Sequence, residues 1–278
     1  MTFIDWYFTF IVFMFGACLG SFLNVCIYRI PAELSVVKPR SRCPKCMTNL
    51  AWRDNIPILG WLMLRGKCRY CKAPISARYP SVELLTAILF TLVWLKYPII
   101  QSEELDFRFL AYWLMMFGLV LGTFVDIDEM WLPDRCTIGG MVLGPIFSFL
   151  IPSMHGAEGH VGGLVLSLVG MGFGFGLFWS ISLLGRLILK KDAMGFGDVK
   201  LMGALGAFLG FESIIFITFV SSLFGAVIGI SFIAMGKREL QSKIPFGPYI
   251  ALAAVIWVLG GSGLWEAYRE WMTVGPGY

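Results

Sequence analysis

The sequence predicts an all-α polytopic membrane protein with about eight transmembrane helices and a small zinc-binding cytoplasmic module between helices 1 and 2. Of its 278 residues, 58% are hydrophobic and only 14% are charged, whereas roughly a quarter of the residues in a soluble domain are charged. Apolar runs recur that are long enough to cross a bilayer, which takes about 20 residues each. The one long polar interruption, residues 29–80, contains two CxxC pairs.

The first apolar run, residues 4–28, has no basic n-region and no small-residue cleavage signal. We expect a retained transmembrane helix here and not a signal peptide. Further helices are expected at 81–97, 108–126, 137–152, 161–185, 198–210, 213–235 and 246–262. The expected domains are therefore 1–28, the first transmembrane helix, 29–80, the polar module, and 81–278, the remaining membrane domain.

The distribution of charge predicts the orientation of the chain. The polar module has two acids, Glu33 and Asp54, against a large excess of basic residues: Arg29, Lys38, Arg40, Arg42, Lys45, Arg53, Arg65, Lys67, Arg69, Lys72 and Arg78. Cytoplasmic loops carry such an excess, so the module is expected inside and the N-terminus outside. Alternating crossings then place the loops near residues 130, 190 and 240 in the cytoplasm as well.

The polar module contains four cysteines in metal-ligand spacing, Cys43 and Cys46 in "CPKC" and Cys68 and Cys71 in "CRYC". Two CxxC pairs are typical of a tetrahedral four-thiolate zinc site. Two disulfides or unrelated buried thiols are the competing interpretations, and the reducing cytoplasm disfavours the disulfides. Four thiolates leave no open coordination position, so the zinc is expected to be structural.

Two acids at the ends of apolar runs are the candidate catalytic residues. Asp126, in "GTFVDIDEMWLPD", ends the third run, and Asp198, in "MGFGDVKL", begins the sixth. Acids at membrane depth are costly and mark functional sites. The predicted topology brings both to the cytoplasmic edge, where two converging carboxyls can share a proton and activate water. A helix N-cap for Asp198 and an ordinary interfacial acid for Asp126 are the competing interpretations.

Having these motifs, the chain resembles the type IV prepilin leader peptidase/N-methyltransferase family, membrane aspartic proteases of the GxGD type. The matching stretches are "GSFLNVCIYRIP" at 20–31, "CPKC", "WRDNIPILGWLMLRGKCRYCKAPISARYPSVE" at 52–83, "DIDEMWLPD" at 126–134, "MGFGDVKL" at 194–201 and "PFGPY" at 245–249. One departure is Met47, since many members have a glycine after the second cysteine.

The resemblance implies a bacterial inner-membrane enzyme that cuts the basic leader from type IV prepilins or type II secretion pseudopilins. Asp126 and Asp198 would be its catalytic pair, acting at the cytoplasmic face within the peptidase domain, 81–278. Many members then methylate the new N-terminus with S-adenosylmethionine, an activity associated with the N-terminal half. Gly66, Arg78 and Glu83 match that part of the pattern and are assigned to methyl transfer.

The expected partners are prepilin or pseudopilin substrates and membrane lipid, with no nucleic acid. Members that lack the cysteine module exist, so a peptidase without methylation is one alternative. A proton-coupled transporter is another, but it predicts repeated halves, and the sequence shows no internal repeat. A zinc-anchored assembly protein without catalysis is the third.

Overall fold

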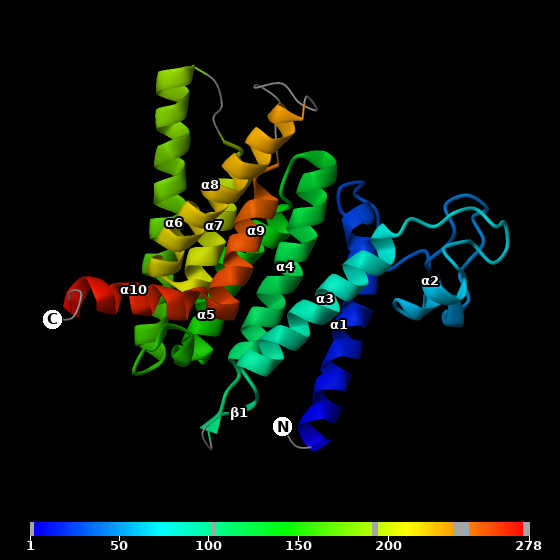
Figure 1. Cartoon of the computed structure of the whole chain (residues 1–278), viewed down its shortest axis with the longest axis horizontal. Helices are drawn as coiled ribbons and strands as arrows, with labels where there is room; N and C mark the ends of the chain where they lie inside the picture. Colours follow the sequence, from blue (N-terminus) through cyan, green and yellow to red (C-terminus); the bar gives the residue numbers. More distant parts are fainter. Residues whose placement is uncertain (1–2, 102–103, 191–193, 236–244, 275–278) are drawn as a thin grey trace. The chain divides into compact units, whose positions relative to one another are not determined.

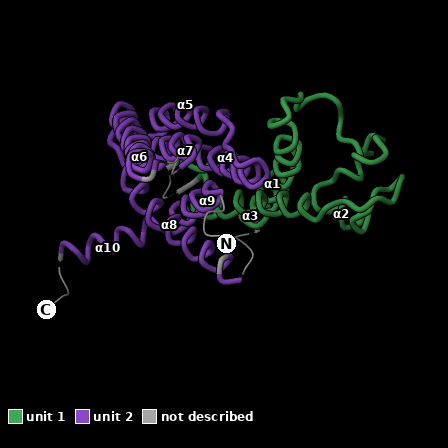
Figure 2. Tube along the Cα trace, turned by 90° about the horizontal axis from the view of Figure 1, so that it is seen from above, with its two compact units in different colours: residues 1–109 green, residues 110–278 purple. Residues whose placement is uncertain are grey.

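The computed structural model describes residues 3–101, 104–190, 194–235 and 245–274, so parts of the loops predicted near 190 and 240 lie outside the described residues. Helices make up most of the described chain (Figure 1). The chain divides into two compact units, residues 1–109 and residues 110–278 (Figure 2).

Unit 1 is built on two long helices, α1 (Phe3–Arg29) and α3 (Arg78–Lys96). They pack closely because glycines of α1 face the backbone of α3. A Cβ atom at Gly16 would lie 2.9 Å from Cα of Ala87, and one at Gly20 would lie 2.6 Å from Cα of Glu83. After α3 the two-residue strands β1 (Ile100–Gln101) and β2 (Glu104–Leu105) pair antiparallel.

The polar module joins α1 to α3 and has little regular structure: a 3₁₀ turn, η1 (Trp52–Asn55), and the short helix α2 (Leu59–Met63). One ion pair between a buried aspartate and an exposed arginine holds it together. The Asp54 carboxylate, whose side chain is 1% exposed, accepts hydrogen bonds from Nε and Nη2 of Arg69 at 2.6 to 3.0 Å. These bonds hold the pKa of Asp54 below its ordinary value. The pair therefore fastens η1 to the segment between Cys68 and Cys71.

Unit 2 is a helical bundle around one central helix. Its elements are α4 (Arg108–Glu129), α5 (Asp134–Leu150), η2 (Pro152–His155), α6 (His160–Leu189), α7 (Phe196–Leu209), α8 (Phe211–Ala234), α9 (Gly247–Ile256), the π-helical turn η3 (Trp257–Gly261) and α10 (Ser262–Val274). The helix α7 is buried along nearly its whole length and contacts α5, α6, α8 and α9. It is the core of the unit.

Small residues let the neighbours of α7 come within backbone contact. A Cβ atom at Gly170 of α6 would collide with the carbonyl oxygen of Gly206 of α7 and lie 2.9 Å from Cα of Gly210. The hydroxyls of Ser148 and Ser167, from α5 and α6, both donate to the carbonyl oxygen of Ala207, at 3.3 and 2.7 Å. Close approach and interhelical hydrogen bonds are the forces that hold helices together in lipid.

The prediction of an all-α polytopic membrane protein is confirmed. Each of the predicted apolar runs coincides with a helix among the described residues. Six of these helices are long and apolar enough to span a membrane: Ile4–Arg29, Arg78–Lys96, Arg108–Glu129, His160–Ile188, Phe211–Phe232 and Gly247–Thr273. The helices α5 and α7 have 17 and 14 residues and fall below that length. The last helical stretch continues to Val274, beyond the predicted end at 262.

We predict that Gly170→Val destabilises unit 2, because the added side chain forces α6 away from α7. Overpacking of this kind costs about 1–3 kcal/mol. Gly172→Val is the matched control, since it makes the same change in α6 at a position where a Cβ atom meets nothing within 4 Å. Thermal unfolding in detergent measures both, and equal melting temperatures for the two variants would contradict the glycine contact.

We also predict that Asp54→Asn loosens the polar module. The lowered pKa means that the ion pair stabilises the fold at neutral pH and that this contribution disappears as pH falls through the folded-state pKa. Loss of a hydrogen-bonded charge costs about 1.5–3 kcal/mol. Limited trypsinolysis at neutral pH measures the change. Glu33→Gln, at the other acid of the module, which is exposed, is the control. Equal cleavage rates in both variants would show that the pair is dispensable.

Candidate active site and metal cluster

Asp126 lies in the last turn of α4 and is 6% exposed. Its Oδ2 atom accepts a hydrogen bond of 2.9 Å from the backbone N–H of Gly247, the first residue of α9. A Cβ atom at Gly247 would lie 2.7 Å from that same oxygen. The glycine of "PFGPY" is therefore needed for the backbone to approach the Asp126 carboxylate closely enough to donate this hydrogen bond.

Asp198 lies in the first turn of α7 and is 8% exposed. The N-cap residue of α7 is Gly195, so the interpretation of Asp198 as an N-cap is wrong. Its carboxyl interacts with the backbone of Gly195 and, electrostatically, with the carboxyl of Asp126. Two acids from separate sequence motifs and separate helices are thus neighbours, at the end of unit 2 where α4 ends and α7 and α9 begin (Figure 1).

One buried leucine contacts the helices that carry both acids and was missed by the sequence analysis. Leu132, 5% exposed, follows α4 in the "WLPD" stretch. Cβ atoms at Gly122, Gly197 and Gly247 would lie 3.2, 3.0 and 3.3 Å from its side-chain atoms. Glycines of α4, α7 and α9 therefore converge on a single side chain. Nothing in the sequence distinguishes this leucine from many others, because its position depends on three helices meeting.

A second contact fixes the beginnings of α5 and α7 relative to each other. Lys200, two residues after Asp198, forms an ion pair with Asp134, the first residue of α5. The Lys200 side chain is 18% exposed and that of Asp134 is 62% exposed, so the pair lies at the surface. Asp128 and Glu129, the other acids of the "DIDE" stretch, are exposed.

The four predicted metal-ligand cysteines come together in unit 1. Their Sγ atoms all lie within 4.8 Å of one another, and those of Cys43 and Cys71 are 3.8 Å apart. Sulfurs bound to one tetrahedral ion at 2.3 Å are separated by about 3.8 Å. Cys43 and Cys68 are buried. The cluster therefore fits a single metal ion bound by four thiolates.

The two CxxC pairs form the same turn twice. In the first, Cys43 donates its N–H to the Thr48 carbonyl and accepts from the N–H of Met47. In the second, Cys68 bonds in the same way to Ala73 and Lys72. Both turns need a positive φ after the second cysteine, 58° at Met47 and 60° at Lys72. A positive φ places Met47 in the left-handed region of backbone conformation, which glycine adopts without steric cost, and this explains why many family members have glycine there.

The residues assigned to methyl transfer lie at three places in unit 1. Glu83, in α3, is 8% exposed and accepts hydrogen bonds from the N–H of Ile58, at 2.6 Å, and from Ser21. Gly66 has a φ of 67° and its carbonyl accepts the N–H of Ile75, so it shapes the turn after α2. Arg78 is the first residue of α3. Of these three residues, Glu83 has the buried titratable side chain.

Comparison with known proteins assigns both units. Residues 14–97 match the bacterial peptidase A24 N-terminal domain, which includes all four cysteines of the cluster. Residues 113–230 match the type IV leader peptidase family and include both buried acids. No solved structure matches the chain.

Curated relatives match along nearly the whole chain. A prepilin leader peptidase/N-methyltransferase of Aeromonas hydrophila is 36% identical over 292 aligned positions, covering 95% of each chain. The protein of the same name from Pseudomonas aeruginosa is 32% identical and covers 92% of each chain. One from Myxococcus xanthus is 38% identical over 79% of this chain and 61% of its own. The protein therefore belongs to the type IV leader peptidase family.

Proposed function

We propose that the protein is a bifunctional membrane enzyme that cuts the basic leader from prepilins or pseudopilins and then N-methylates the new N-terminal residue. The observation that carries the peptidase activity is the pairing of Asp126 with Asp198, two buried carboxyls on different helices. Membership of the family and the names of the relatives support both activities. The proposed peptidase domain is residues 81–278.

In the proposed mechanism one carboxyl of the pair is ionised and the other carries a proton, because close like charges resist ionising together. The ionised carboxylate takes a proton from a water molecule while the water oxygen attacks the scissile carbonyl carbon. The protonated carboxyl gives its proton to the carbonyl oxygen. When the C–N bond breaks, the proton taken from water passes to the leaving amine, and one hydroxyl of the tetrahedral intermediate returns its proton to the other carboxylate, which restores the pair. The pair titrates as a unit, so the two roles belong to the pair.

The Gly247 N–H orients Asp126 in this scheme, and Leu132 keeps the two helix ends at a fixed spacing. Mechanistically, fixed carboxylates need no reorganisation when the water attacks. We place the pair at the cytoplasmic face of the bacterial inner membrane, with eight crossings and the N-terminus outside. The apolar segment of the substrate then lies in the bilayer and its basic leader in the cytoplasm.

We assign zinc to the cysteine cluster of the module, residues 29–80, which follows the first transmembrane helix, residues 1–28. Cys43, Cys46, Cys68 and Cys71 would hold the ion, and their geometry fits a tetrahedral site. Four thiolates fill the coordination sphere, so the ion supplies folding energy and takes no part in the chemistry. The Asp54–Arg69 pair also stabilises the second turn, because Arg69 lies between Cys68 and Cys71.

We assign the methyl transfer to unit 1, which contains the N-terminal family domain and lies outside the matched peptidase region. S-adenosylmethionine supplies an electrophilic methyl group for the new amino terminus. Glu83 is a buried acid in α3 of this unit and is proposed to take part in methyl transfer, with Gly66 and Arg78 shaping the surrounding turns. This chemistry belongs to a site separate from the paired aspartates.

We predict that Asp126→Asn and Asp198→Asn each lower the cleavage of a prepilin-like substrate by at least about 100-fold, because acid–base groups contribute about 10²–10⁴-fold. An amide cannot exchange the proton that the mechanism needs. Gel-based processing assays on purified protein measure the rates. Glu129→Gln, at an exposed acid of the same stretch, is the control and should cleave normally. Wild-type cleavage by either asparagine variant would exclude the aspartyl mechanism.

We predict that elemental analysis finds one zinc per chain and that Cys68→Ser lowers this content sharply, because a site with three thiolates loses part of its affinity. Cys136→Ser is the matched control, since Cys136 lies in α5, away from the cluster sequence. Its metal content should equal that of the wild type. A wild-type protein without metal, or a Cys68→Ser protein with full metal content, would refute the four-thiolate site.

A further inference from the structure

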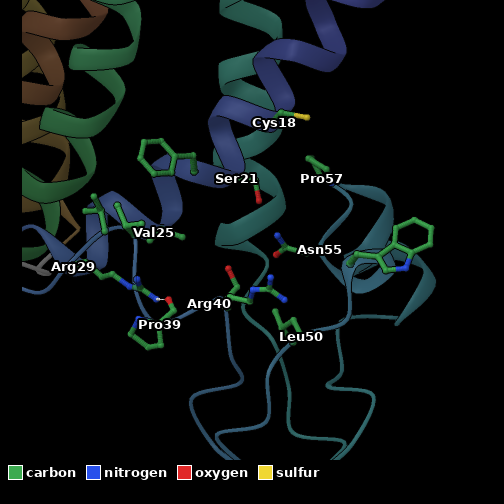
Figure 3. Close-up of a pocket in the computed structure, with 14 residues that line it drawn as sticks. Cys18, Ser21, Val25, Arg29, Pro39, Arg40, Leu50, Asn55 and Pro57 are labelled. Carbon is green, nitrogen blue, oxygen red and sulfur yellow. Dashed lines mark hydrogen bonds between the residues drawn. The ribbon is translucent and has the colours of Figure 1, made fainter.

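A cleft of about 630 Å³ opens in unit 1 between one face of α1 and the loops of the polar module (Figure 3). The α1 residues that line it, among them Cys18, Ser21, Val25 and Arg29, recur at helical spacing and so share one face. The opposite wall comes from residues on both sides of the first CxxC turn. The volume is within the range of about 300–1,000 Å³ that is typical of small-molecule sites.

The lining of the cleft includes exposed apolar side chains. Trp52 is 81% exposed and Val37 is 77% exposed, and both line it, together with Phe22 at 43%. An indole exposed to this degree has little packing role in the fold. Aromatic side chains in such a cleft offer flat, apolar surface to a planar ring of a ligand.

The cleft also presents one cation that is not engaged. The guanidinium of Arg29 donates to the carbonyl oxygens of Ser35 and Pro39, both at 2.8 Å, and so holds the loop. Arg40 lines the cleft and forms no hydrogen bond or ion pair with any residue that the structure describes. Figure 3 shows the side chains of Ser21, Asn55 and Arg40 reaching toward the same space.

A buried carboxyl group lies behind the helical wall of the cleft. Ser21, which lines the cleft, hydrogen-bonds to the carboxyl group of Glu83, which also accepts the N–H of Ile58, next to the lining residue Pro57. The cleft therefore combines a free cation near its loop wall, a buried carboxyl group behind its helical wall, and aromatic surface. A ligand that suits it has a carboxylate, a separate positive centre and a planar ring.

We propose that this cleft binds S-adenosylmethionine, with Arg40 pairing with its carboxylate, Trp52 contacting its adenine, and Glu83, through Ser21, lying on the side of its sulfonium. The inference rests on the proposed methyltransferase function and assigns a site to it. The cleft lies wholly within residues 14–97, the N-terminal family domain, and shares no residue with the region that contains the aspartates.

Equilibrium binding of radiolabelled S-adenosylmethionine to the purified, zinc-loaded protein tests the assignment. We expect the wild type to bind one equivalent, Arg40→Gln to weaken binding at least about tenfold, since it removes a charged hydrogen bond, and Trp52→Ala to weaken it about as much. Trp52→Phe, which keeps an aromatic ring, should recover most of the affinity. Arg53→Gln is the control, because this exposed arginine of the same module does not line the cleft.

Metal content and trypsin resistance show whether each variant is folded, so a weakened affinity is attributable to the site. Wild-type affinity in both Arg40→Gln and Trp52→Ala would overturn the assignment of the cleft while leaving methyl transfer intact. A wild type that neither binds the donor nor yields a methylated product by mass spectrometry would overturn methyl transfer itself. If Arg40→Gln and Trp52→Ala lose bound phosphatidylglycerol but keep wild-type affinity for S-adenosylmethionine, the cleft is a lipid headgroup site and the proposal is refuted.

Discussion

The proximity of two buried carboxyls, on Asp126 and Asp198, is the constraint around which unit 2 is arranged. Like charges removed from water repel strongly, and a protein that holds them together needs rigid support for both. That support comes from the backbone N–H of Gly247 and from Leu132, against which three glycines pack. The burial of α7 on nearly all sides supplies the rest, because a helix in backbone contact with its neighbours cannot shift to relieve the repulsion.

The polar module reaches its fold by a different route. It is too small to bury a core, and its regular structure consists of η1 and α2. Two copies of one turn bring four cysteine sulfurs together, and the Asp54–Arg69 pair connects that cluster to η1. The polar module thus depends on a few strong polar contacts, whereas unit 2 depends mainly on close packing between helices. A small module commonly needs a metal in place of a core.

Much of this arrangement could be predicted from sequence because its signals are local. Apolar run length predicted the helices, and CxxC spacing predicted that Cys43, Cys46, Cys68 and Cys71 would cluster. Counting crossings placed the two acids at one edge, although they belong to separate motifs. The number of membrane-spanning helices was harder to predict. The helices α5 and α7 are shorter than a bilayer needs, so whether they cross it depends on how they pack against their neighbours. The end of α10 was missed because charges such as Glu266 and Arg269 break the apolar pattern.

The role of Leu132 and the Asp54–Arg69 pair could not be predicted at all, because both arise from contacts between segments that sequence periodicity does not connect. The same holds for the cleft beside Trp52, which is made by one face of a helix and by loops that precede and follow a CxxC turn. Sites of this kind are properties of tertiary structure.

The delivery of the two carboxyls by two different helices makes their separation depend on how those helices pack. Asp126 ends α4 and Asp198 begins α7, and α7 has only 14 residues. Because α7 is buried along nearly its whole length, its helical neighbours and not the lipid hold its position. A substitution in the core of unit 2 that moves α7 can therefore change the separation of the carboxyls without touching either acid.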